Sequence, residues 1–265
     1  MHPNVLSIAG LDPSGGAGVL ADVKTFAALR CHGLAAVTAL TVQNTRGIAG
    51  IQIVAPQFVG AQLDALFGDI EIAAVKIGML AEPSIVKTVA QSLGKHRAKN
   101  VVLDPLLAAS SGESLASGDV AAALLQHLAP LVTLVTPNLA EAAALARAPT
   151  PTTIAEMREL AEDLHRRGFA SVLVKGGHLA GATCDDALFD GARHRIFSSP
   201  RVSTPNTHGT GCTLSAAIAA NLALGLDLEA SVEAAKDYVA QALAKADELD
   251  VGQGPGPLHH LHRFW

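Results

Sequence analysis

The chain has 265 residues, of which 49% are hydrophobic and 3% aromatic, and its formal net charge at pH 7 is −5. This acidic balance, without any basic cluster, argues against a nucleic-acid-binding surface. Cys31, Cys184 and Cys212 lie far apart, which excludes a disulfide framework and a Cys-x-x-Cys metal site. Because no apolar run reaches the roughly 20 residues of a membrane span, we expect a cytoplasmic protein whose residues 1–265 form one domain.

Apolar strands and amphipathic helices alternate along the chain, beginning with a short strand at 5–9 and a glycine-rich loop at 10–18. A helix follows to about residue 30, and then a strand at 36–42 that ends at Gln43. This opening implies a parallel pair of strands with a right-handed crossover. Further strands are predicted at 73–77, 101–103, 132–135 and 171–175, further helices at 56–67, 83–93, 119–127, 154–167, 213–224 and 229–247, and a hairpin at 186–197.

We therefore predict a three-layer αβα sandwich with a mostly parallel central sheet. Polar or glycine-rich motifs fall just after several strands. The carboxyl ends of parallel strands share one edge of the sheet, where ligands bind. The motifs that follow strands in this way contain Asp12, Gln43, Met79, Asp104, Asn138 and Lys175.

A second glycine-rich turn, at 206–213, opens directly onto a helical apolar pattern. Backbone N–H groups at Gly209, Thr210 and Gly211, together with the positive end of the helix dipole, are suited to cradle an anion. Cys212 lies in the first turn of that helix, where the same field favours a thiolate. The alternative is an ordinary glycine turn followed by a buried, inert cysteine.

Two familiar nucleotide motifs are absent or incomplete. Residues 16–21 fit the dinucleotide pattern G-x-G-x-x-A, but the second strand ends at Gln43 and not at an acidic residue, which argues against a dehydrogenase. The chain has no G-x-x-x-x-G-K-[ST] sequence, so a P-loop ATPase is also disfavoured.

Asn138 and Glu141 fit two roles. Their spacing is that of a helix capping box, but the same oxygens could also hold a hydrated Mg²⁺ beside nucleotide phosphates. Lys175, next to two glycines, suits a phosphate contact, and Asp104 lies at the same sheet edge. The histidine-rich tail at 259–262 has no acidic or cysteine partner nearby, so we expect a surface or subunit-contact tail and not a metal site.

Six motifs, taken together and in this order, closely resemble the bacterial hydroxymethylpyrimidine/phosphomethylpyrimidine kinases of thiamine biosynthesis, which are members of the ribokinase-like superfamily. The resemblance covers nearly the whole chain. It implies ATP-dependent phosphorylation of 4-amino-5-hydroxymethyl-2-methylpyrimidine, and then of its monophosphate to the diphosphate. The motifs lie at residues 11–18, 38–45, 76–80, 136–141, 175–178 and 206–213.

The resemblance also implies how the pyrimidine is bound. The side-chain amide of Gln43 pairs with the ring nitrogen and the exocyclic amine of the substrate. Met79 packs near the ring. Gly10, Val42 and Asp12 complete the substrate pocket.

For catalysis, the resemblance implies that Gly209, Thr210 and Gly211 form the anion hole for the transferring phosphoryl group. Cys212 stands where many sugar kinases of the superfamily carry a catalytic aspartate. Lys175, Asp104 and Asn138 are expected to contact the nucleotide, and Glu141 and Asn138 to hold Mg²⁺ through water. A homodimer is also implied.

Two other functions stay open from the sequence. A pyridoxine or pyridoxal kinase has the same fold. A catalytically inactive, pyrimidine-binding regulatory protein is the second alternative, although the intact Cys212, Lys175 and Asn138–Glu141 set argues against it.

Overall fold

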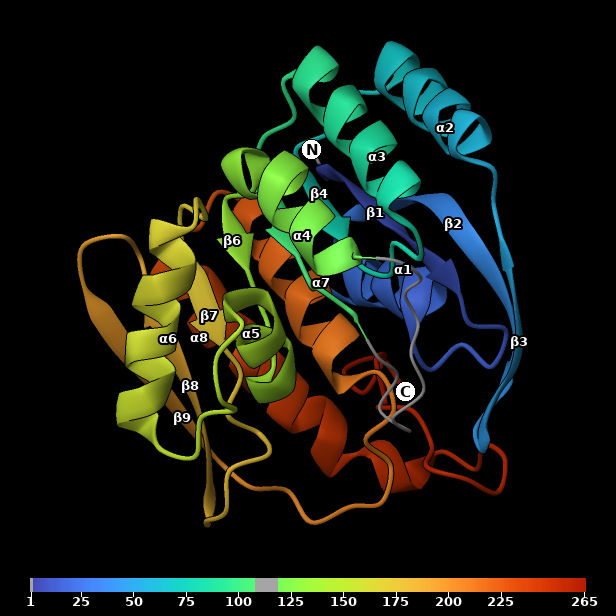
Figure 1. Ribbon diagram of the computed structural model, residues 1–265. Coiled ribbons are helices and arrows are strands. Elements are labelled where there is room, and N and C mark those ends of the chain that lie inside the picture. The colour runs from blue at the N-terminus through green and yellow to red at the C-terminus, as the bar shows by residue number, and fades with distance from the viewer. Residues whose placement is uncertain (1, 108–118) are drawn as a thin grey trace.

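A computed structural model describes residues 2–107 and 119–265, and in this part of the chain a nine-stranded sheet forms the centre (Figure 1). Its strands are β1 (Asn4–Leu11), β2 (His32–Asn44), β3 (Gly47–Ile53), β4 (Ala74–Ile77), β5 (Val101–Leu103), β6 (Leu134–Val135), β7 (Val172–Val174), β8 (Thr183–Phe189) and β9 (His194–Pro200). They are ordered β3-β2-β1-β4-β5-β6-β7-β8-β9. In this spatial order, the inner strands β2, β1, β4, β5, β6 and β7 run parallel to one another. At the edges, β3 is antiparallel to β2, and β8 and β9 form a hairpin in which β8 is antiparallel to β7.

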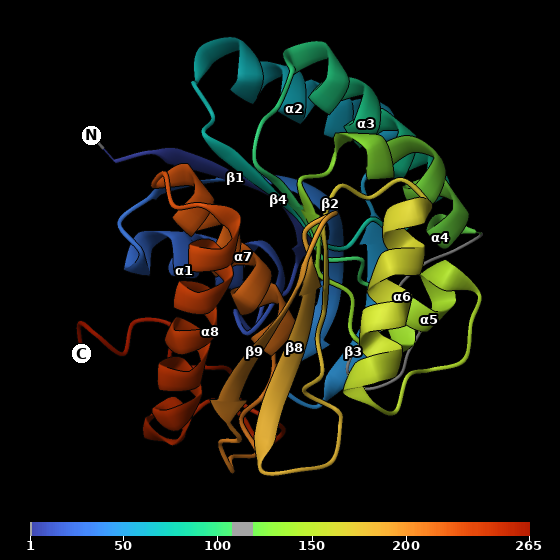
Figure 2. The ribbon, with the colours of Figure 1, turned by 90° about the vertical axis from the view of Figure 1, so that its left-hand side faces the viewer.

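The helices cover both faces of the sheet, as Figure 2 shows, so the predicted three-layer αβα architecture is confirmed. One face carries α2 (Pro56–Asp69), α3 (Pro83–His96), α4 (Val120–Ala123), α5 (Leu139–Ala146) and α6 (Ile154–Arg166). The other carries α1 (Gly18–Ala28), α7 (Thr210–Ala223) and α8 (Leu228–Ala244).

Successive residues of a strand place their side chains in these two cores in turn. In β1, Leu6 and Ile8 pack against the α2–α6 layer, while Val5 packs against the layer of α1, α7 and α8. Side chains of a strand point to opposite faces in turn, and both faces of this sheet are buried. The inner strands are therefore apolar on both sides, which leaves their ends as the place for polar side chains.

The sequence missed β3 and placed Gln43 in a loop. Instead, β2 continues to Asn44 and turns through two residues into β3, with Asn44 paired to Gly47. Such a two-residue link is a common hairpin connection. The strand escaped prediction because an edge strand with half-exposed side chains and an internal glycine, Gly50, has no continuous apolar run.

Two other segments differ in detail from the predicted elements. The helix expected at 119–127 is α4, which passes at once into a π-helical turn, Leu124–Leu128, and a 3₁₀ turn, Ala129–Leu131. The strand expected at 132–135 is reduced to the two residues of β6.

The C-terminal histidines are not a surface tail. His259 and His260 are buried, and the Tyr238 hydroxyl of α8 donates to the His260 carbonyl at 2.7 Å. The His260 ring nitrogen Nε2 lies 3.0 Å from the Thr213 hydroxyl of α7. Burial lowers the pKa of His260 to about 3, so the ring is neutral. The tail therefore packs against the start of α7, which overturns the expectation from the sequence.

A fully buried ion pair joins α1 to the sheet. Lys76 of β4 and Asp22 of α1 are both 0% exposed, and Nζ lies 2.8 and 2.9 Å from the two carboxylate oxygens. The Ser7 hydroxyl of β1 also donates to Asp22, at 2.6 Å. Burial by itself lowers the pKa of Lys76, but the charges of Asp22 and Asp104 and the hydrogen bond to Asp22 together outweigh it, so the pKa is held above its usual value and Lys76 stays charged. Burial raises the pKa of Asp22, and Lys76 opposes that rise.

We expect Lys76→Met to lower the free energy of unfolding by about 3–5 kcal/mol, because it leaves the Asp22 carboxyl buried without a charged partner. Urea denaturation measures this loss. Lys95→Met is the matched control: it breaks the exposed Lys95–Asp64 pair and should barely change stability, since solvent screens such pairs. Similar losses for the two variants would contradict the role assigned to the buried pair.

Candidate active site

The sheet edge brings Asp104, Lys175 and the second glycine turn together, as the strand ends predict. Asp104 follows β5 and Lys175 follows β7, and the Lys175 ammonium lies 2.6 Å from Asp104 Oδ1. A side-chain Cβ at Gly211 would lie only 3.1 Å from that ammonium and 3.7 Å from Asp104 Oδ2. The first turn of α7 therefore faces the Lys175–Asp104 pair directly.

Lys175 carries a positive charge at this point. Burial alone lowers the pKa of its ammonium, but the neighbouring charges of Asp104 and Glu141 outweigh the burial, and the pKa is held above its usual value. A fixed cation beside the first turn of a helix suits the binding of a phosphate group.

Glu141 forms the capping box that the spacing allowed. Its Oε2 accepts the Asn138 backbone N–H at 2.8 Å, and its own N–H donates to Asn138 Oδ1 at 2.9 Å. Burial raises the pKa of Glu141 to about 7; the Lys175 charge opposes this rise and the Asp104 charge adds to it. The structure therefore confirms the capping role, and it also places the Glu141 carboxyl within the electrostatic reach of Lys175 and Asp104.

Cys212 is buried behind this turn, at 6% exposure. Burial raises the pKa of its thiol to about 11, although the Lys76 charge and a backbone hydrogen bond from Gly18 act in the opposite direction. The expectation that the helix terminus favours a thiolate is wrong for the protein without ligands. The cost of desolvating the anion exceeds the stabilisation that the α7 dipole and Lys76 provide.

The loop after β1 forms the other side of the site. Asp12 is buried and accepts hydrogen bonds from the backbone N–H groups of Ser14, at 2.8 Å, and Ala17, at 2.9 Å. Burial raises its pKa, but hydrogen bonds from His208 and Ser14 outweigh this, so the pKa is lowered and the carboxyl is ionised.

His208 links two of the predicted substrate residues and was not itself predicted. Its Nε2 lies 2.8 Å from Asp12 Oδ2 and 3.4 Å from Gln43 Nε2. The signal that could have found it is its place in the glycine turn, one residue before Gly209.

The remaining predicted pocket residues divide into two groups. Met79 and Gly10 are neighbours, since a Cβ at Gly10 would lie 3.1 Å from the Met79 sulfur, and the Thr38 hydroxyl donates to the Met79 carbonyl at 2.7 Å. Val42, by contrast, is 67% exposed to solvent and is paired with Gly50 of β3, so it is not packed with Met79 and Gly10.

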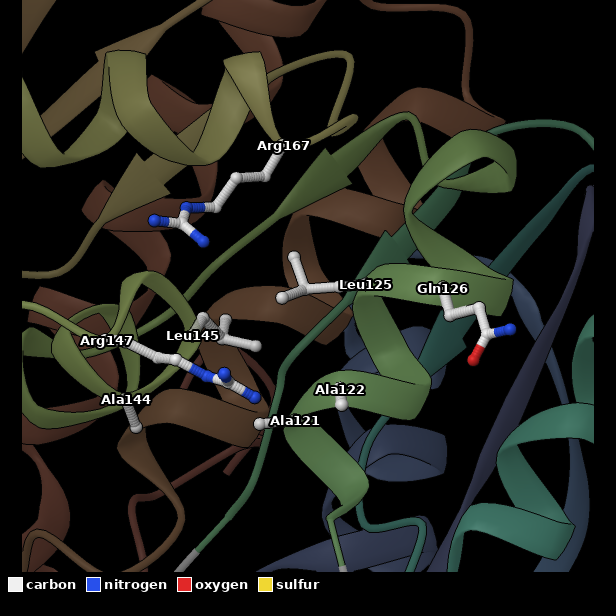
Figure 3. Close-up of a pocket in the computed structure, with 8 residues that line it drawn as sticks. All are labelled: Ala121, Ala122, Leu125, Gln126, Ala144, Leu145, Arg147 and Arg167. Atoms are coloured by element: carbon white, nitrogen blue, oxygen red, sulfur yellow. The ribbon is translucent and has the colours of Figure 1, made fainter.

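A separate pocket lies between α4 and its following π turn on one side and the ends of α5 and α6 on the other (Figure 3). None of the predicted site residues lines it. We therefore do not assign the candidate site to this pocket, which is lined by Ala121, Ala122, Leu125, Gln126, Ala144, Leu145, Arg147 and Arg167.

Residues 2–107 and 119–265 contain no group of three or more His, Cys, Asp or Glu side chains placed to hold a metal ion. Mg²⁺ in nucleotide sites is commonly bound by one or two carboxylates together with substrate phosphates and water. Glu141 could supply such a carboxylate, with the neighbouring Asn138 as the amide ligand. Within the same described residues, no helix is long and apolar enough to cross a membrane.

A glycine turn that opens a helix beside a fixed lysine and two carboxylates, at the edge of a parallel sheet, defines a phosphoryl-transfer site of the small-molecule kinase class. The model of the phosphomethylpyrimidine kinase family matches residues 12–259, and the chain belongs to this family.

Three relatives illustrate the similarity. The Escherichia coli hydroxymethylpyrimidine/phosphomethylpyrimidine kinase is 49% identical over 99% of this chain and 98% of that protein. The phosphomethylpyrimidine kinase of Clostridium difficile is similar in structure, with 34% identity, a TM-score of 0.81 and coverage of 91% and 99% of the two chains. An ADP complex of Bacillus subtilis pyridoxal kinase has 34% identity, a TM-score of 0.90 and 98% coverage of each chain. The predicted family and ribokinase-like fold are thus confirmed.

The raised pKa of Cys212 has a direct spectroscopic consequence. We expect no ultraviolet thiolate absorbance from this residue between about pH 6 and pH 9, because the ligand-free thiol ionises only near pH 11. The measurement is the difference spectrum between the wild type and Cys212→Ser. A thiolate signal that appears below pH 8 and vanishes in the variant would restore the original expectation for a helix terminus.

Proposed function

We propose that this site transfers the γ-phosphoryl group of ATP to 4-amino-5-hydroxymethyl-2-methylpyrimidine, and then a second phosphoryl group to the resulting monophosphate. The observation that carries the proposal is the convergence at Gly211, where the glycine turn meets Lys175 and Asp104 and is followed at once by Cys212. A cation and an anion cradle at one point are what the transfer of a charged group requires.

In the first reaction the hydroxymethyl oxygen forms a bond to the γ-phosphorus of ATP, and the bond from that phosphorus to the bridging oxygen of ADP breaks. The hydroxyl proton passes to Cys212 Sγ, which acts as general base. Backbone N–H groups of Gly209, Thr210 and Gly211, with the charge of Lys175, stabilise the phosphoryl oxygens. Because the resting thiol is neutral, it must first give its own proton to a water molecule, and the thiolate so formed then takes the hydroxyl proton.

The second reaction makes a smaller demand on a base. Its attacking group is a phosphate oxygen that is already largely ionised at neutral pH, with a second pKa near 6. The same anion hole and the same lysine serve both transfers, since both move a phosphoryl group. This contrast supports separate roles for Cys212 and for the glycine turn.

We assign Mg²⁺ binding to Glu141 and Asn138, through water. When bound with the nucleotide, the ion would neutralise the phosphate charge. The fit rests on the buried Glu141 carboxyl: burial raises its pKa to about 7 despite the Lys175 charge, so a further cation beside it would stabilise the ionised form. One Glu141 oxygen serves the helix cap, and the carboxyl is within the electrostatic reach of Lys175 and Asp104, where phosphates are expected to bind.

The substrate side of the site is assigned to Gln43, Met79, Gly10, Asp12 and the backbone of Val42. The family match over residues 12–259 supports treating residues 1–265 as one kinase domain. A homodimer is supported by exposed apolar side chains on the β2–β3 hairpin, where Leu40 and Val42 lie on the same face of β2. The proposed cytoplasmic location follows from the sequence and from ATP as co-substrate.

The function is tested by separate steady-state assays that start from the pyrimidine alcohol and from its monophosphate, with pyridoxal as the competing substrate. The wild type should phosphorylate both pyrimidines and prefer the alcohol to pyridoxal. Cys212→Ala should slow the first transfer by roughly 10²–10⁴-fold, the usual value of general-base assistance, and the second transfer much less.

Gly211→Val is the matched comparison, because its side chain would press on the Lys175 ammonium and should impair both transfers. Equal losses in the two steps for Cys212→Ala would mean that Cys212 positions the turn or the substrate and is not the base. A preference for pyridoxal in the wild type would overturn the substrate assignment.

Glu141→Gln separates metal binding from helix capping. In the wild type, protonation of Glu141 below about pH 7 removes the charge that attracts Mg²⁺, so the Mg²⁺ concentration needed for half-maximal activity should rise as the pH falls. The variant should need high Mg²⁺ at every pH. Its melting temperature should change little, since Gln can still accept the Asn138 N–H.

The chain offers a matched control in the exposed capping box of α6, where the Glu156 carboxylate accepts the Thr153 backbone N–H. Glu156→Gln should leave the Mg²⁺ requirement and its pH dependence unaltered. A Glu141→Gln enzyme with the wild-type Mg²⁺ requirement would return Glu141 to a purely structural role.

A further inference from the structure

A chain of polar contacts runs from Asp12 through His208 and Gln43 to Thr41. His208 Nε2 lies 2.8 Å from Asp12 Oδ2, and Gln43 Nε2 lies 3.4 Å from the same ring nitrogen. At the far end, the Thr41 hydroxyl oxygen lies 3.0 Å from Gln43 Oε1 and 2.9 Å from the Leu11 carbonyl oxygen. Gln43 is therefore held from both sides.

The donors and acceptors of this chain indicate how the Gln43 amide is turned. The ionised Asp12 carboxylate only accepts, so the nitrogen 2.8 Å away must carry a proton. An Nε2–H of His208 has no lone pair left to accept a bond from the Gln43 amide nitrogen. Two N–H donors would then face each other between His208 and Gln43.

The Thr41 end leads to the same conclusion. Thr41 has a single hydroxyl proton and two neighbouring oxygens that only accept; we direct the proton to the Leu11 carbonyl, the nearer of the two at 2.9 Å, because the amide of Gln43 can turn and that carbonyl cannot. Thr41 then has only lone pairs to offer Gln43, and these require an N–H and not a carbonyl oxygen. A half-turn of the amide, which exchanges two atoms of almost the same size, removes both contacts between like groups, and the Nε2–H of His208 is then shared between Asp12 Oδ2 and Gln43 Oε1.

We propose that His208 is a positioning residue that fixes the Gln43 amide with Oε1 toward His208 and Nε2 toward Thr41. The inference rests on the proposed function, in which Gln43 pairs with the aminopyrimidine. His208 is itself held in place: a Cβ at Gly16 would lie 2.2 Å from its ring carbon Cδ2, and its backbone N–H donates to the Gly256 carbonyl at 3.1 Å.

The orientation of the amide decides which way the substrate faces. The exocyclic amine donates to Oε1 and therefore lies on the His208 side, while the ring nitrogen accepts from Nε2 on the Thr41 side. The hydroxymethyl group is on the ring carbon next to the amine, so it projects beyond the amine toward Gly209 and the anion hole. The opposite amide orientation would turn the ring over and direct the reacting oxygen toward Thr41, away from the phosphoryl group.

The test compares the natural 4-amino alcohol with its 4-oxo analogue. The amino alcohol offers an amine donor and a ring-nitrogen acceptor, whereas the analogue offers a carbonyl acceptor and a ring N–H donor. In the wild type, when the hydroxymethyl group of the analogue is placed for reaction, its carbonyl oxygen faces Gln43 Oε1 and its ring N–H faces the Gln43 Nε2–H group. His208→Leu removes the donor and leaves the amide free to turn. We expect kcat/KM for the amino alcohol to fall about tenfold, the effect of one lost hydrogen bond to a polar site. The amino-over-oxo preference should fall by a similar factor, while the KM for ATP is unchanged.

His208→Gln, which retains an N–H for Asp12, should recover much of the preference. Thr41→Val removes the other contact with little change of shape, and it should lower the preference in the same way even if the His208 variants fold poorly. Equal losses for the two substrates, or an unaltered preference in both Thr41→Val and His208→Leu, would overturn the inference. A wild-type enzyme that does not phosphorylate the amino alcohol would instead overturn the proposed function.

Discussion

The site depends on a direct contact between two backbones. Gly209, at the start of α7, has φ of 82°, and a Cβ there would lie 1.8 Å from the Gly16 carbonyl oxygen of the loop after β1. No other residue fits that position, because the left-handed backbone and the close approach both exclude a side chain. The contact brings together loops that are far apart in the sequence. His208 then reaches Asp12, and Cys212 lies near Gly18 at the start of α1.

Buried charge gives this site its chemistry. Lys76 and Lys175 are each held by an aspartate, Asp22 and Asp104 respectively, so both ammonium groups stay charged away from solvent. Cys212 lies among the same charges, but the burial of its thiol dominates and raises the pKa to about 11. The site thus combines fixed cations with a neutral thiol. A thiol kept neutral in this way is protected from oxidation, since the thiolate is the reactive form.

Most elements and most site residues were accessible from the sequence, for identifiable reasons. The strands that carry Asp104, Asn138 and Lys175 are short apolar runs, and parallel strands necessarily bring their carboxyl ends to one edge. The capping box followed from the spacing of Asn138 and Glu141 alone. β3 was not accessible, because an edge strand has no buried face to impose a pattern. The burial of His259 and His260 was missed because it depends on α7 and α8, which pack over the tail.

The sequence by itself determined the αβα fold, the polar edge of the sheet and the family, because hydrophobic periodicity and local motifs are properties of neighbouring residues. Only the tertiary structure decided the state of the side chains at the site. The pKa of the Cys212 thiol depends on how deeply α7 is buried and on Lys76, a residue of another element. The link from Asp12 to Gln43 depends on a histidine that reaches both only after the two glycine loops have met. Burial and distance between remote segments are not encoded in local pattern, so these features appear only in the folded chain.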